Sequence, residues 1–536
     1  MTGRTLSHSR FLLCLIAIAT SATVAHAQTY TDLFDFDGTS HGCCSTFPGV
    51  LAQGRDGNLY GTALQGGANG RGVIFKSTLT GSVTVLHNFN VTDGYNPQGG
   101  LSLGTDGNFY GTTVSGGSDS AGTIFQITPS GTHTVLYNFA NGTDGGFPRN
   151  SPVQGSDGQF YGTTVVGSNS TIYKVTATGT LTKVATLGLE CDGPLILATD
   201  GKFYGVTVVG GTSNRGSVFS VTNAGVLKTI FSFNDPTGAL PFGPILQGTD
   251  GNFYGTASTG GTSGGGVVYK LTSAGAFTVL HNFDGVNRAL GNDPVTGLVQ
   301  GSDGFLYGVT SGGGAHLFGT IFKVKTDGTG FVVVNDLDGS HGAAPNSQPL
   351  LHTNGKIYGQ TNSGGSHNDG VLYSLAAGLK QFVQPVVIKQ AKVGGSVGLL
   401  GQNFSTATKV LFGTGAGTFT TSGNGFMTAK PANGDTTGVI TVDEPGGNLV
   451  SPQSFKILPV IKTFLPASGP VGTQVVLTGT SFMQATAVKF GTKVATFTVN
   501  SDTQITTTVP AGAVTAKISV TTPGGTATTS TNFTVQ

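Results

Sequence analysis

The stretch Gly104-Thr-Asp-Gly-Asn-Phe-Tyr-Gly-Thr112 recurs unchanged as Gly248-Thr-Asp-Gly-Asn-Phe-Tyr-Gly-Thr256. Its Tyr-Gly pair occurs in seven places, and the tyrosines are Tyr60, Tyr110, Tyr161, Tyr204, Tyr254, Tyr307 and Tyr358. Self-similarity at a nearly constant spacing of about 50 residues is typical of repeat architectures, in which each repeat is one supersecondary unit. The sequence therefore predicts seven such units.

Each unit contains four short runs of β-branched and aromatic residues, which indicate β-strands. Asp-Gly separates the first run from the second in six units, and Asn354-Gly355 stands there in the seventh. We expect a two-residue type I′ hairpin at this point, in which both central residues have positive φ. Because asparagine makes the same turn without a charge, the six aspartates are interpreted as turn residues rather than as calcium ligands or catalytic acids.

Four-stranded units repeated seven times are typical of a β-propeller. Residues 31–38 resemble the fourth run of a unit, whereas the seventh unit ends soon after residues 371–375. We therefore expect the N-terminal strand to complete the seventh blade. The predicted fold is all-β, a seven-bladed β-propeller at residues 28–384 followed by two immunoglobulin-like β-sandwiches.

The two C-terminal segments, residues 385–457 and 458–536, match each other at a constant offset of 78 residues. The matching pairs are 401–404 with 479–482, 410–413 with 488–491, and 445–447 with 523–525. Short alternating strands and frequent turn residues predict a small sandwich in each segment, without the cysteine pair of antibody domains.

Composition excludes several classes of protein. The 89 glycines follow no strict every-third period, so the chain is not collagen-like, and 37% hydrophobic residues are too many for a disordered chain. A net charge of +1 provides no field that would attract nucleic acid or an anionic membrane. We therefore expect no nucleic-acid partner.

Residues 1–27 have the pattern of a secretory signal peptide, with Arg4 and Arg10 before an apolar stretch and Ala25-His26-Ala27 at the end. We expect export to the periplasm, the cell surface or the medium, with no membrane insertion of the mature chain. Three cysteines then remain, Cys43, Cys44 and Cys191. Free thiols are favoured over a strained vicinal bridge between Cys43 and Cys44.

Both halves resemble known families. The unit with Asp-Gly-Asn-Phe-Tyr-Gly-Thr, continued by runs such as 122–127 and 134–139, is similar to the tandem GloVer repeat of exported bacterial proteins. Residues 466–472, 479–482, 509–512 and 522–525 resemble an IPT/TIG domain, and residues 385–457 resemble a more divergent one. The resemblance implies a cell-envelope or extracellular protein. The repeat family carries no catalytic residues to transfer, and IPT/TIG modules of exported proteins serve as spacers or interaction domains.

The sequence contains no His-Glu-x-x-His, Cys-x-x-Cys or Walker-type motif, so we assign no catalytic residue, metal or cofactor. His87 and His281 occupy the same repeat position and are interpreted as structural. In a propeller, the loops that join consecutive units share a face with the loops between the second and third runs, and loops carry function. Aromatic and planar cationic groups there could stack on sugars or bind carboxylates, and the candidates are Tyr95, Phe147, Arg149, Arg288, His316 and His341.

Three hypotheses follow. The favoured one is a non-catalytic exported binding or surface-interaction protein, with the propeller as the recognition disc for a glycan or a protein and the sandwiches as spacer or docking modules. The second is a polysaccharide-active enzyme with Asp, His and Arg residues in the propeller funnel, which would require paired carboxylates. The third is a structural repeat protein of a surface layer. The sequence alone leaves the ligand and the oligomeric state open.

Overall fold

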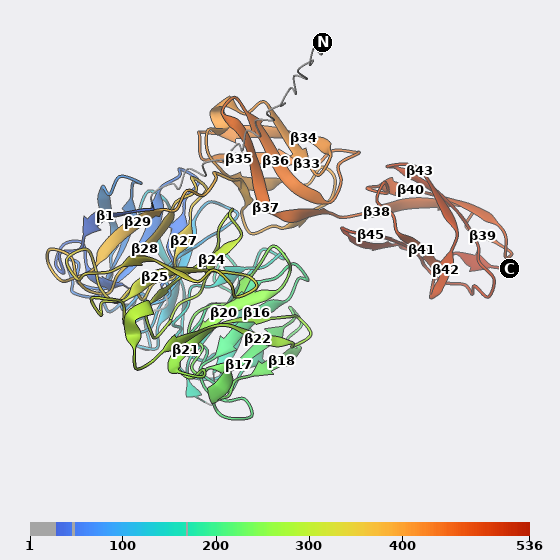
Figure 1. The fold of residues 1–536 in the computed structure, drawn as a ribbon. Helices are drawn as coiled ribbons and strands as arrows, with labels where there is room; N and C mark the ends of the chain where they lie inside the picture. Colours follow the sequence, from blue (N-terminus) through green and yellow to red (C-terminus); the bar gives the residue numbers. More distant parts are fainter. Residues whose placement is uncertain (1–27, 46–48, 168–169) are drawn as a thin grey trace, which may run out of the picture.

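The computed structural model describes residues 28–45, 49–167 and 170–536 (Figure 1). The expected signal peptide lies outside these residues. Strands dominate the described chain, as predicted, and the helical segments are short 3-10 turns such as η2 (Asp235–Thr237), η3 (Arg288–Leu290) and η4 (Phe404–Thr406). Among the described residues, no helix has the length and apolar character that a membrane span requires.

The repeats form seven antiparallel sheets, and in six of them the four repeat strands lie in sequence order. The strands of the first three sheets are β3 (Ala52–Gln53), β4 (Leu59–Gln65), β5 (Val73–Ser77) and β6 (Val83–Asn88); β7 (Ser102–Leu103), β8 (Phe109–Thr113), β9 (Thr123–Ile127) and β10 (His133–Asn138); and β11 (Val153–Gln154), β12 (Phe160–Thr163), β13 (Thr171–Val175) and β14 (Leu181–Thr186). In the first sheet β2 (Cys43–Ser45) also pairs with β4.

The next three sheets have the same order. Their strands are β15 (Ile196–Leu197), β16 (Phe203–Thr207), β17 (Ser217–Val221) and β18 (Leu227–Ser232); β19 (Leu246–Gln247), β20 (Phe253–Ala257), β21 (Gly264–Leu271) and β22 (Phe277–Asp284); and β23 (Val299–Gln300), β24 (Phe305–Thr310), β25 (Thr320–Lys325) and β26 (Val332–Asp336).

The seventh sheet takes its fourth strand from the other end of the repeat region. It consists of β27 (Leu350–Leu351), β28 (Ile357–Gln360), β29 (Val371–Ala376) and the N-terminal β1 (Thr29–Asp35). β1 runs antiparallel to β29, with Thr29 opposite Ala376 and Asp35 opposite Val371. The prediction that the N-terminal strand completes the last unit is confirmed.

Hydrophobic clusters join the sheets in a closed cycle. Each cluster draws on two consecutive sheets, and the one that joins the seventh sheet to the first contains Phe36, Leu59, Phe75, Tyr358 and Leu372. We call this arrangement the seven-sheet ring. Because each sheet is covered by two neighbours, the core is spread around the ring rather than gathered in one place.

The repeated motif makes these contacts. Tyr60 Oη donates to the Asp56 carboxylate over 2.9 Å, and its ring stacks on Phe109 of the next sheet with centroids 4.1 Å apart. The glycine after the tyrosine leaves room for an aromatic ring of the third strand, since a Cβ on Gly61 would lie 2.7 Å from the Phe75 ring. Tyr-Gly therefore recurs for packing reasons.

The turn before the tyrosine differs from the prediction. In the first unit Gly54 N donates to Asn58 O and Gly57 N to Gly54 O, which makes a three-residue loop with only Gly57 at positive φ. This is a type I turn followed by a left-handed glycine, and the type I′ prediction was wrong. Asp56 has a negative φ, and its carboxylate accepts from the Asn58 backbone N–H. Its interpretation as a turn residue therefore holds.

The first C-terminal module is an eight-stranded sheet folded over one core that includes Phe404, Phe412 and Phe455. Its strands are β30 (Gln384–Pro385), β31 (Gln390–Ala391), β32 (Val397–Leu400), β33 (Lys409–Phe412), β34 (Gly415–Ser422), β35 (Phe426–Lys430), β36 (Gly438–Glu444) and β37 (Gly447–Ile457).

The second C-terminal module has two four-stranded sheets and one two-stranded sheet around Phe482, Phe490 and Phe533, and it projects away from the ring in Figure 1. Its strands are β38 (Val460–Leu465), β39 (Ser468–Gly469), β40 (Gln474–Thr480), β41 (Ala487–Phe490), β42 (Lys493–Ala495), β43 (Phe497–Ser501), β44 (Gln504–Thr508), β45 (Ile518–Thr522), β46 (Gly525–Thr528) and β47 (Thr534–Val535).

Candidate functional site

The first module is docked on the ring through the ends of the innermost strands. Lys456 Nζ donates to the Thr199 carbonyl over 2.6 Å, and Gln453 Nε2 donates to the Gln247 carbonyl over 2.9 Å. On the other side of the ring, the Arg55 guanidinium lies 4.2 Å from the centre of the Phe426 ring. These contacts lie at the turns between first and second strands, so the module covers that face of the ring.

A cavity of about 720 Å³ lies between the innermost strands and the module. Its ring side comes from the fifth, sixth and seventh sheets, with Leu246, Val299 and Leu350, and its module side comes from β30, Lys389 and residues 448–455 of β37. Exposed residues of the lining, including Lys380 and Gln381, mark its mouth. A cavity of this size can hold a ligand of several rings.

Amide groups and one amine provide the polar lining. Among the described residues, none hydrogen-bonds the side-chain amides of Gln348, Gln381 or Gln384, so these groups are free to bind a ligand. Within the described part of the chain, Lys389 Nζ has one hydrogen-bond partner, the Leu197 carbonyl at 3.3 Å. Burial lowers the pKa of Lys389 from its ordinary value. A second oxygen-bearing partner would therefore be favourable at this amine.

The lining contains no Asp or Glu among the residues that the structure describes. Glycoside hydrolysis ordinarily requires a carboxylic acid and a carboxylate on either side of the scissile bond. The cavity therefore has groups that can bind an oxygen-rich ligand, and it lacks that catalytic pair in its described lining.

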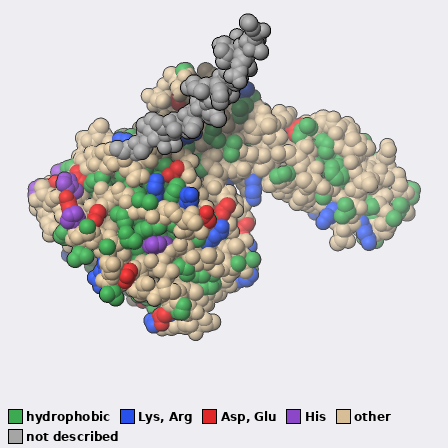
Figure 2. All heavy atoms as spheres, in the orientation of Figure 1, with side chains coloured by type: hydrophobic (Ala, Val, Ile, Leu, Met, Phe, Trp, Pro, Cys, Tyr) green, Lys and Arg blue, Asp and Glu red, His purple; other side chains and the backbone are tan. Residues whose placement is uncertain are grey.

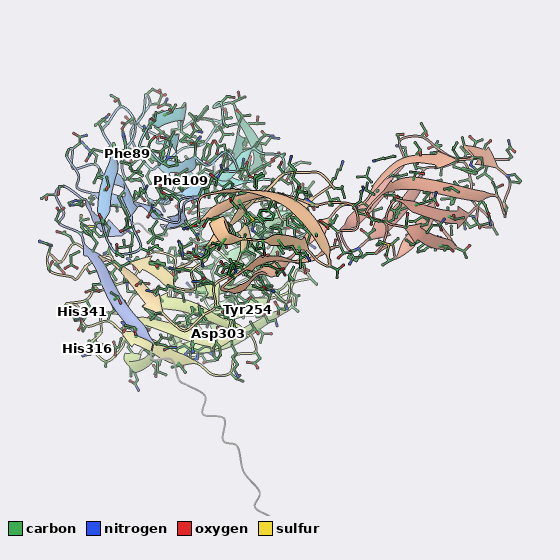
Figure 3. All side chains as sticks on the ribbon, turned by 90° about the horizontal axis from the view of Figure 1, so that it is seen from above. Phe89, Phe109, Tyr254, Asp303, His316 and His341 are labelled. Carbon is green, nitrogen blue, oxygen red and sulfur yellow. The ribbon has the colours of Figure 1, made fainter. Side chains whose placement is uncertain are left out.

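The six predicted site residues lie elsewhere. They belong to the loops at the opposite end of the strands from the docked module, and Figure 3 shows His316 and His341 at the rim of the ring. In the described part of the chain, no hydrogen bond, ion pair or ring contact joins any two of the six. The structure does not bring them together into one site.

Most of these six side chains already contact a neighbouring group in the structure. Arg149 Nη1 binds the buried Asp192 carboxylate of the next sheet over 2.9 Å, and Phe147 packs against the cluster between the second and third sheets. His341 Nδ1 lies 2.8 Å from an Asp338 oxygen, and Figure 2 shows histidine and acidic side chains next to each other at the left edge of the ring. Arg288 is exposed, and its Nε donates to the Gly285 carbonyl.

Tyr95 and His316 have different surroundings from the other four predicted residues. Tyr95 is half-buried and lies under the Arg71 guanidinium, 4.6 Å from its ring centre. His316 Nδ1 is 3.8 Å from Asp336 Oδ1, and its side chain is 57% exposed. Of the six predicted residues, Tyr95, with the Arg71 guanidinium over its ring, is therefore the best placed to bind a planar ligand.

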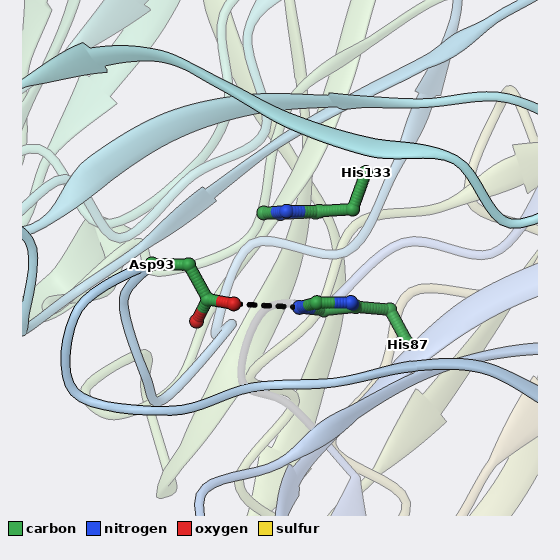
Figure 4. Close-up of side chains that lie close together, drawn as sticks. All are labelled: His87, Asp93 and His133. Carbon is green, nitrogen blue, oxygen red and sulfur yellow. Dashed lines mark hydrogen bonds and ion pairs between the residues drawn. The ribbon is translucent and has the colours of Figure 1, made fainter.

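His87, Asp93 and His133 place their ligating atoms within 4.8 Å of one another (Figure 4). The two imidazole rings are parallel, 6° apart with centroids separated by 4.0 Å. A histidine binds a metal through a lone pair in its ring plane, and the lone pairs of parallel stacked rings do not converge on one ion. This geometry does not fit a metal.

The same stack recurs elsewhere with other rings. His281 stacks on Phe331 with centroids 3.6 Å apart, and Phe231 stacks on Phe277 at 4.1 Å. Each pair joins the outer strands of neighbouring sheets. We therefore interpret the His87 and His133 pair as a packing contact, in keeping with the structural role predicted for His87 and His281.

The sequence analysis missed Lys389 and the cavity. Glutamine recurs in the innermost strands at Gln53, Gln154, Gln247 and Gln300, and this regularity is visible in the sequence. These glutamines form hydrogen bonds between neighbouring sheets. For example, Gln154 Oε1 accepts from the Thr105 backbone N–H. Lys389 lies outside the seven Tyr-Gly units, so no position shared by those units could have identified it.

The sequence pattern of the Gloeobacter/Verrucomicrobia repeat matches residues 20–193, 171–298 and 285–455, which together span most of the chain. The protein belongs to the Gloeobacter/Verrucomicrobia repeat family. The IPT/TIG pattern matches residues 459–535 of this family member, which confirms the second module as an IPT/TIG domain. Residues 385–455 fall within the repeat match instead. A search of proteins with curated functions finds no relative.

Solved structures resemble this repeat protein only distantly. The surface glycan-binding protein PbSGBP-B from Prevotella bryantii is 16% identical over 28% of this chain and 41% of its own, with a TM-score of 0.23. A fungal alcohol oxidase is 13% identical over 95% and 100% of the two chains, with a TM-score of 0.43.

A putative 6-phosphogluconolactonase from Bacteroides fragilis is 17% identical over 59% and 98% of the two chains, with a TM-score of 0.41. The chain spans less than half the length of the first two glycan-binding structures that it matches. Scores at this level assign no function to the repeat protein.

Proposed function

We propose that this protein is an exported, non-catalytic binding protein whose seven-sheet ring is a seven-bladed β-propeller. The cavity between the ring and the first module carries the proposal, because it combines free amides and a buried amine in a space large enough for a ligand. Export rests on the signal-peptide pattern of residues 1–27. The closed cycle of sheet contacts supports the propeller.

The ligand that fits this lining best is an acidic glycan. Amides such as those of Gln348 and Gln384 can both donate to and accept from hydroxyl groups, while Leu350 and Pro385 provide apolar surface for the faces of sugar rings. The Lys389 amine adds a positive charge, and no described carboxylate in the lining offsets it. A uronate carboxylate would supply the missing partner of this amine.

The two C-terminal modules have different roles in this proposal. The first, a divergent IPT/TIG-like sandwich, forms one wall of the binding site and fixes it against the ring. The second projects from the ring and acts as a spacer or docking unit. Glycan hydrolysis is the less favoured function, because the described lining of the cavity has no carboxylate pair.

Calorimetric titration of the purified protein with matched pairs of neutral and uronate-containing oligosaccharides tests this proposal. We expect saturable binding of acidic glycans, and we expect Lys389→Gln to weaken it by about tenfold, which corresponds to about 1.4 kcal/mol. Lys228→Gln, on an exposed outer strand, is the matched control and should leave the affinity unchanged.

Three outcomes would count against the proposal. Binding to no oligosaccharide in the panel would reject glycan recognition. Equal affinity for neutral and acidic members would reject the role of the Lys389 charge. Loss of binding in Tyr95→Ala or Arg288→Ala, with Lys389→Gln unaffected, would move the site to the loops at the other face of the ring.

A further inference from the structure

Cys43 and Cys44 are neighbours in the chain, and their sulfur atoms are 2.8 Å apart. In a regular strand, successive side chains point to opposite faces of the sheet, so adjacent thiols do not meet. Here Cys44 has a φ of +63°, in the left-handed region. This backbone conformation breaks the alternation at the start of β2 and brings the two thiols to the same side.

The surrounding structure fixes the segment in this conformation. Cys44 N donates to the Asp369 carbonyl over 3.1 Å, and Cys43 pairs with Gln65 at the edge of β4. Gly42 has a φ of +80°, and a Cβ there would lie 2.7 Å from Ala63 Cβ. The close approach of the two sulfur atoms is therefore set by the backbone of this segment and by its contacts with Asp369 and β4, rather than by a freely rotating side chain.

The third cysteine is separate from this pair. Cys191 is fully buried in the cluster between the third and fourth sheets, where its Sγ lies 3.4 Å from the Gly193 carbonyl. It cannot reach Cys43 or Cys44 without opening the ring. The odd number of cysteines thus divides into one adjacent pair and one packed thiol.

We propose that Cys43 and Cys44 are a modification site at which the two thiols close to a vicinal disulfide. Both residues are thiols in the structure, and the sequence analysis favoured that state. A disulfide bond is about 2.05 Å long, so the sulfur atoms need to approach by less than about 1 Å. The proposal depends on export only for the source of the oxidant.

The oxidant is a small disulfide or a disulfide oxidoreductase. One thiol loses its proton, and its thiolate attacks a sulfur of the oxidant; the S–S bond of the oxidant breaks, its other sulfur leaves as a thiolate that takes up a proton, and a mixed disulfide forms. The neighbouring thiol then loses its proton and displaces the remaining sulfur of the oxidant, so that the oxidant ends with two thiol groups, on two molecules for a small disulfide or on one oxidoreductase, which hold the two protons and the electron pair. Burial raises the pKa of Cys43 to about 12, so the Cys43 thiol attacks slowly. We therefore expect the oxidant to react with Cys44 first.

Adjacency also predicts how stable the bond is. Bridged cysteines usually have their Cα atoms about 4.4–6.8 Å apart, whereas adjacent residues are fixed at about 3.8 Å. We therefore expect this disulfide to be reduced more readily than ordinary structural disulfides. The disulfide would then form or break with the redox state of the surroundings. Its two cysteines lie in β2, which pairs with β4 of the first sheet.

Mass spectrometry of the mature protein, residues 28–536, tests the proposal, because Cys14 is then absent. The protein is equilibrated in glutathione buffers of increasing oxidised fraction, denatured, alkylated and digested with trypsin. In this chain no Lys or Arg precedes Arg55, so Cys43 and Cys44 stay in the tryptic peptide 28–55, while Cys191 lies in the peptide 184–202. We expect the first peptide to lose two hydrogen atoms and to escape alkylation, and Cys191 to be alkylated.

The same digestion can overturn the proposal. Two alkylated cysteines in the first peptide at the most oxidising buffer would reject it, as would a crosslink to residues 184–202 or between two chains. Cys44→Ser should abolish the two-hydrogen loss, and Cys191→Ser should leave it intact. Persistence of the loss in Cys44→Ser would show a different modification.

Discussion

Gln53 and Thr353 are 300 residues apart in the chain and form two hydrogen bonds with each other. Gln53 Nε2 donates to Thr353 Oγ1 over 2.8 Å, and the Thr353 backbone N–H donates to Gln53 Oε1 over 3.0 Å. The Thr353 hydroxyl also donates to the Gly401 carbonyl of the first module. This pair therefore joins the first sheet, the seventh sheet and the module at the point where the ring closes.

Gln53→Leu should destabilise the protein by about 1–3 kcal/mol, because it leaves the Thr353 N–H buried without a partner. Leucine is acceptable in size, since Leu103 and Leu197 occupy this position in the second and fourth sheets. Gln300→Leu is the matched control: its partner Thr249 N–H belongs to an exposed residue, so water can replace the lost bond. Urea unfolding measures both, and equal losses would contradict the prediction.

Tyr269→Phe should leave the free energy of unfolding unchanged or raise it by about 1 kcal/mol. The Tyr269 hydroxyl is buried with no hydrogen-bond partner among the described residues. Phenylalanine occupies the same repeat position at Phe75, Phe125, Phe219 and Phe322. Removing an unsatisfied polar group is neutral or favourable, whereas Tyr269→Ala should cost about 3–5 kcal/mol through the cavity it leaves. A clear loss of stability in Tyr269→Phe would show that the hydroxyl has a partner.

Asp250→Asn should retain most of the stability, and Asp250→Ala should lose about 1–2 kcal/mol. In the seventh unit the Asn354 amide donates to the Tyr358 hydroxyl, so asparagine keeps this contact with donor and acceptor exchanged. Burial raises the pKa of Asp250, but hydrogen bonds from Asn252, Tyr254 and Lys270 outweigh it and bring the pKa to about 2. The stabilisation is therefore present above the ordinary pKa near 3.8 and is lost as the pH falls towards 2.

Thermal unfolding of both Asp250 variants, with and without a calcium chelator, checks this interpretation. The chelator should have no effect on the wild-type protein if the repeated aspartate is a turn residue. A large chelator effect, or an Asp250→Asn variant as unstable as Asp250→Ala, would show that the charge itself is needed.

His133→Phe should make the protein less sensitive to acid. Burial, together with the neighbouring His87, lowers the pKa of His133 from 6.5 to about 3. The unfolded chain then binds a proton near pH 6.5 and the folded chain does not until about pH 3, so stability falls as the pH drops between these values. Phenylalanine keeps the stack, as Phe277 and Phe331 do at this position.

The measurement is the free energy of unfolding at pH 7 and pH 4 for both proteins. We expect the wild type to lose about 3 kcal/mol more than the variant between these pH values, since each pKa unit corresponds to about 1.4 kcal/mol. His87 and Asp93 face the same ring and are present in both proteins. Identical pH dependence would mean that His133 is solvated.

The sequence predicted the architecture well because the repeats encode local rules. Seven Tyr-Gly pairs with their turns marked seven units, and the likeness of residues 31–38 to a fourth strand placed β1 against β29. The type I′ turn was wrong because turn type depends on the φ of Asp56, and an Asp-Gly dipeptide suits both kinds of turn.

The candidate site was harder to predict because a sequence does not say which groups already have partners. Arg149 looked available in the sequence, yet it is paired with Asp192 from the next sheet. Lys389 looked ordinary, yet the docking of the first module leaves its amine with one partner at the wall of a cavity.

The sequence by itself determined the strands, their grouping into seven units and the two modules, because alternation, turns and repeat spacing are local properties. The tertiary structure alone decided that the first module covers one face of the ring, that Gln53 meets Thr353 and that the thiols of Cys43 and Cys44 lie on the same side. These relationships depend on how separate elements pack and on single backbone angles, which composition and periodicity do not specify.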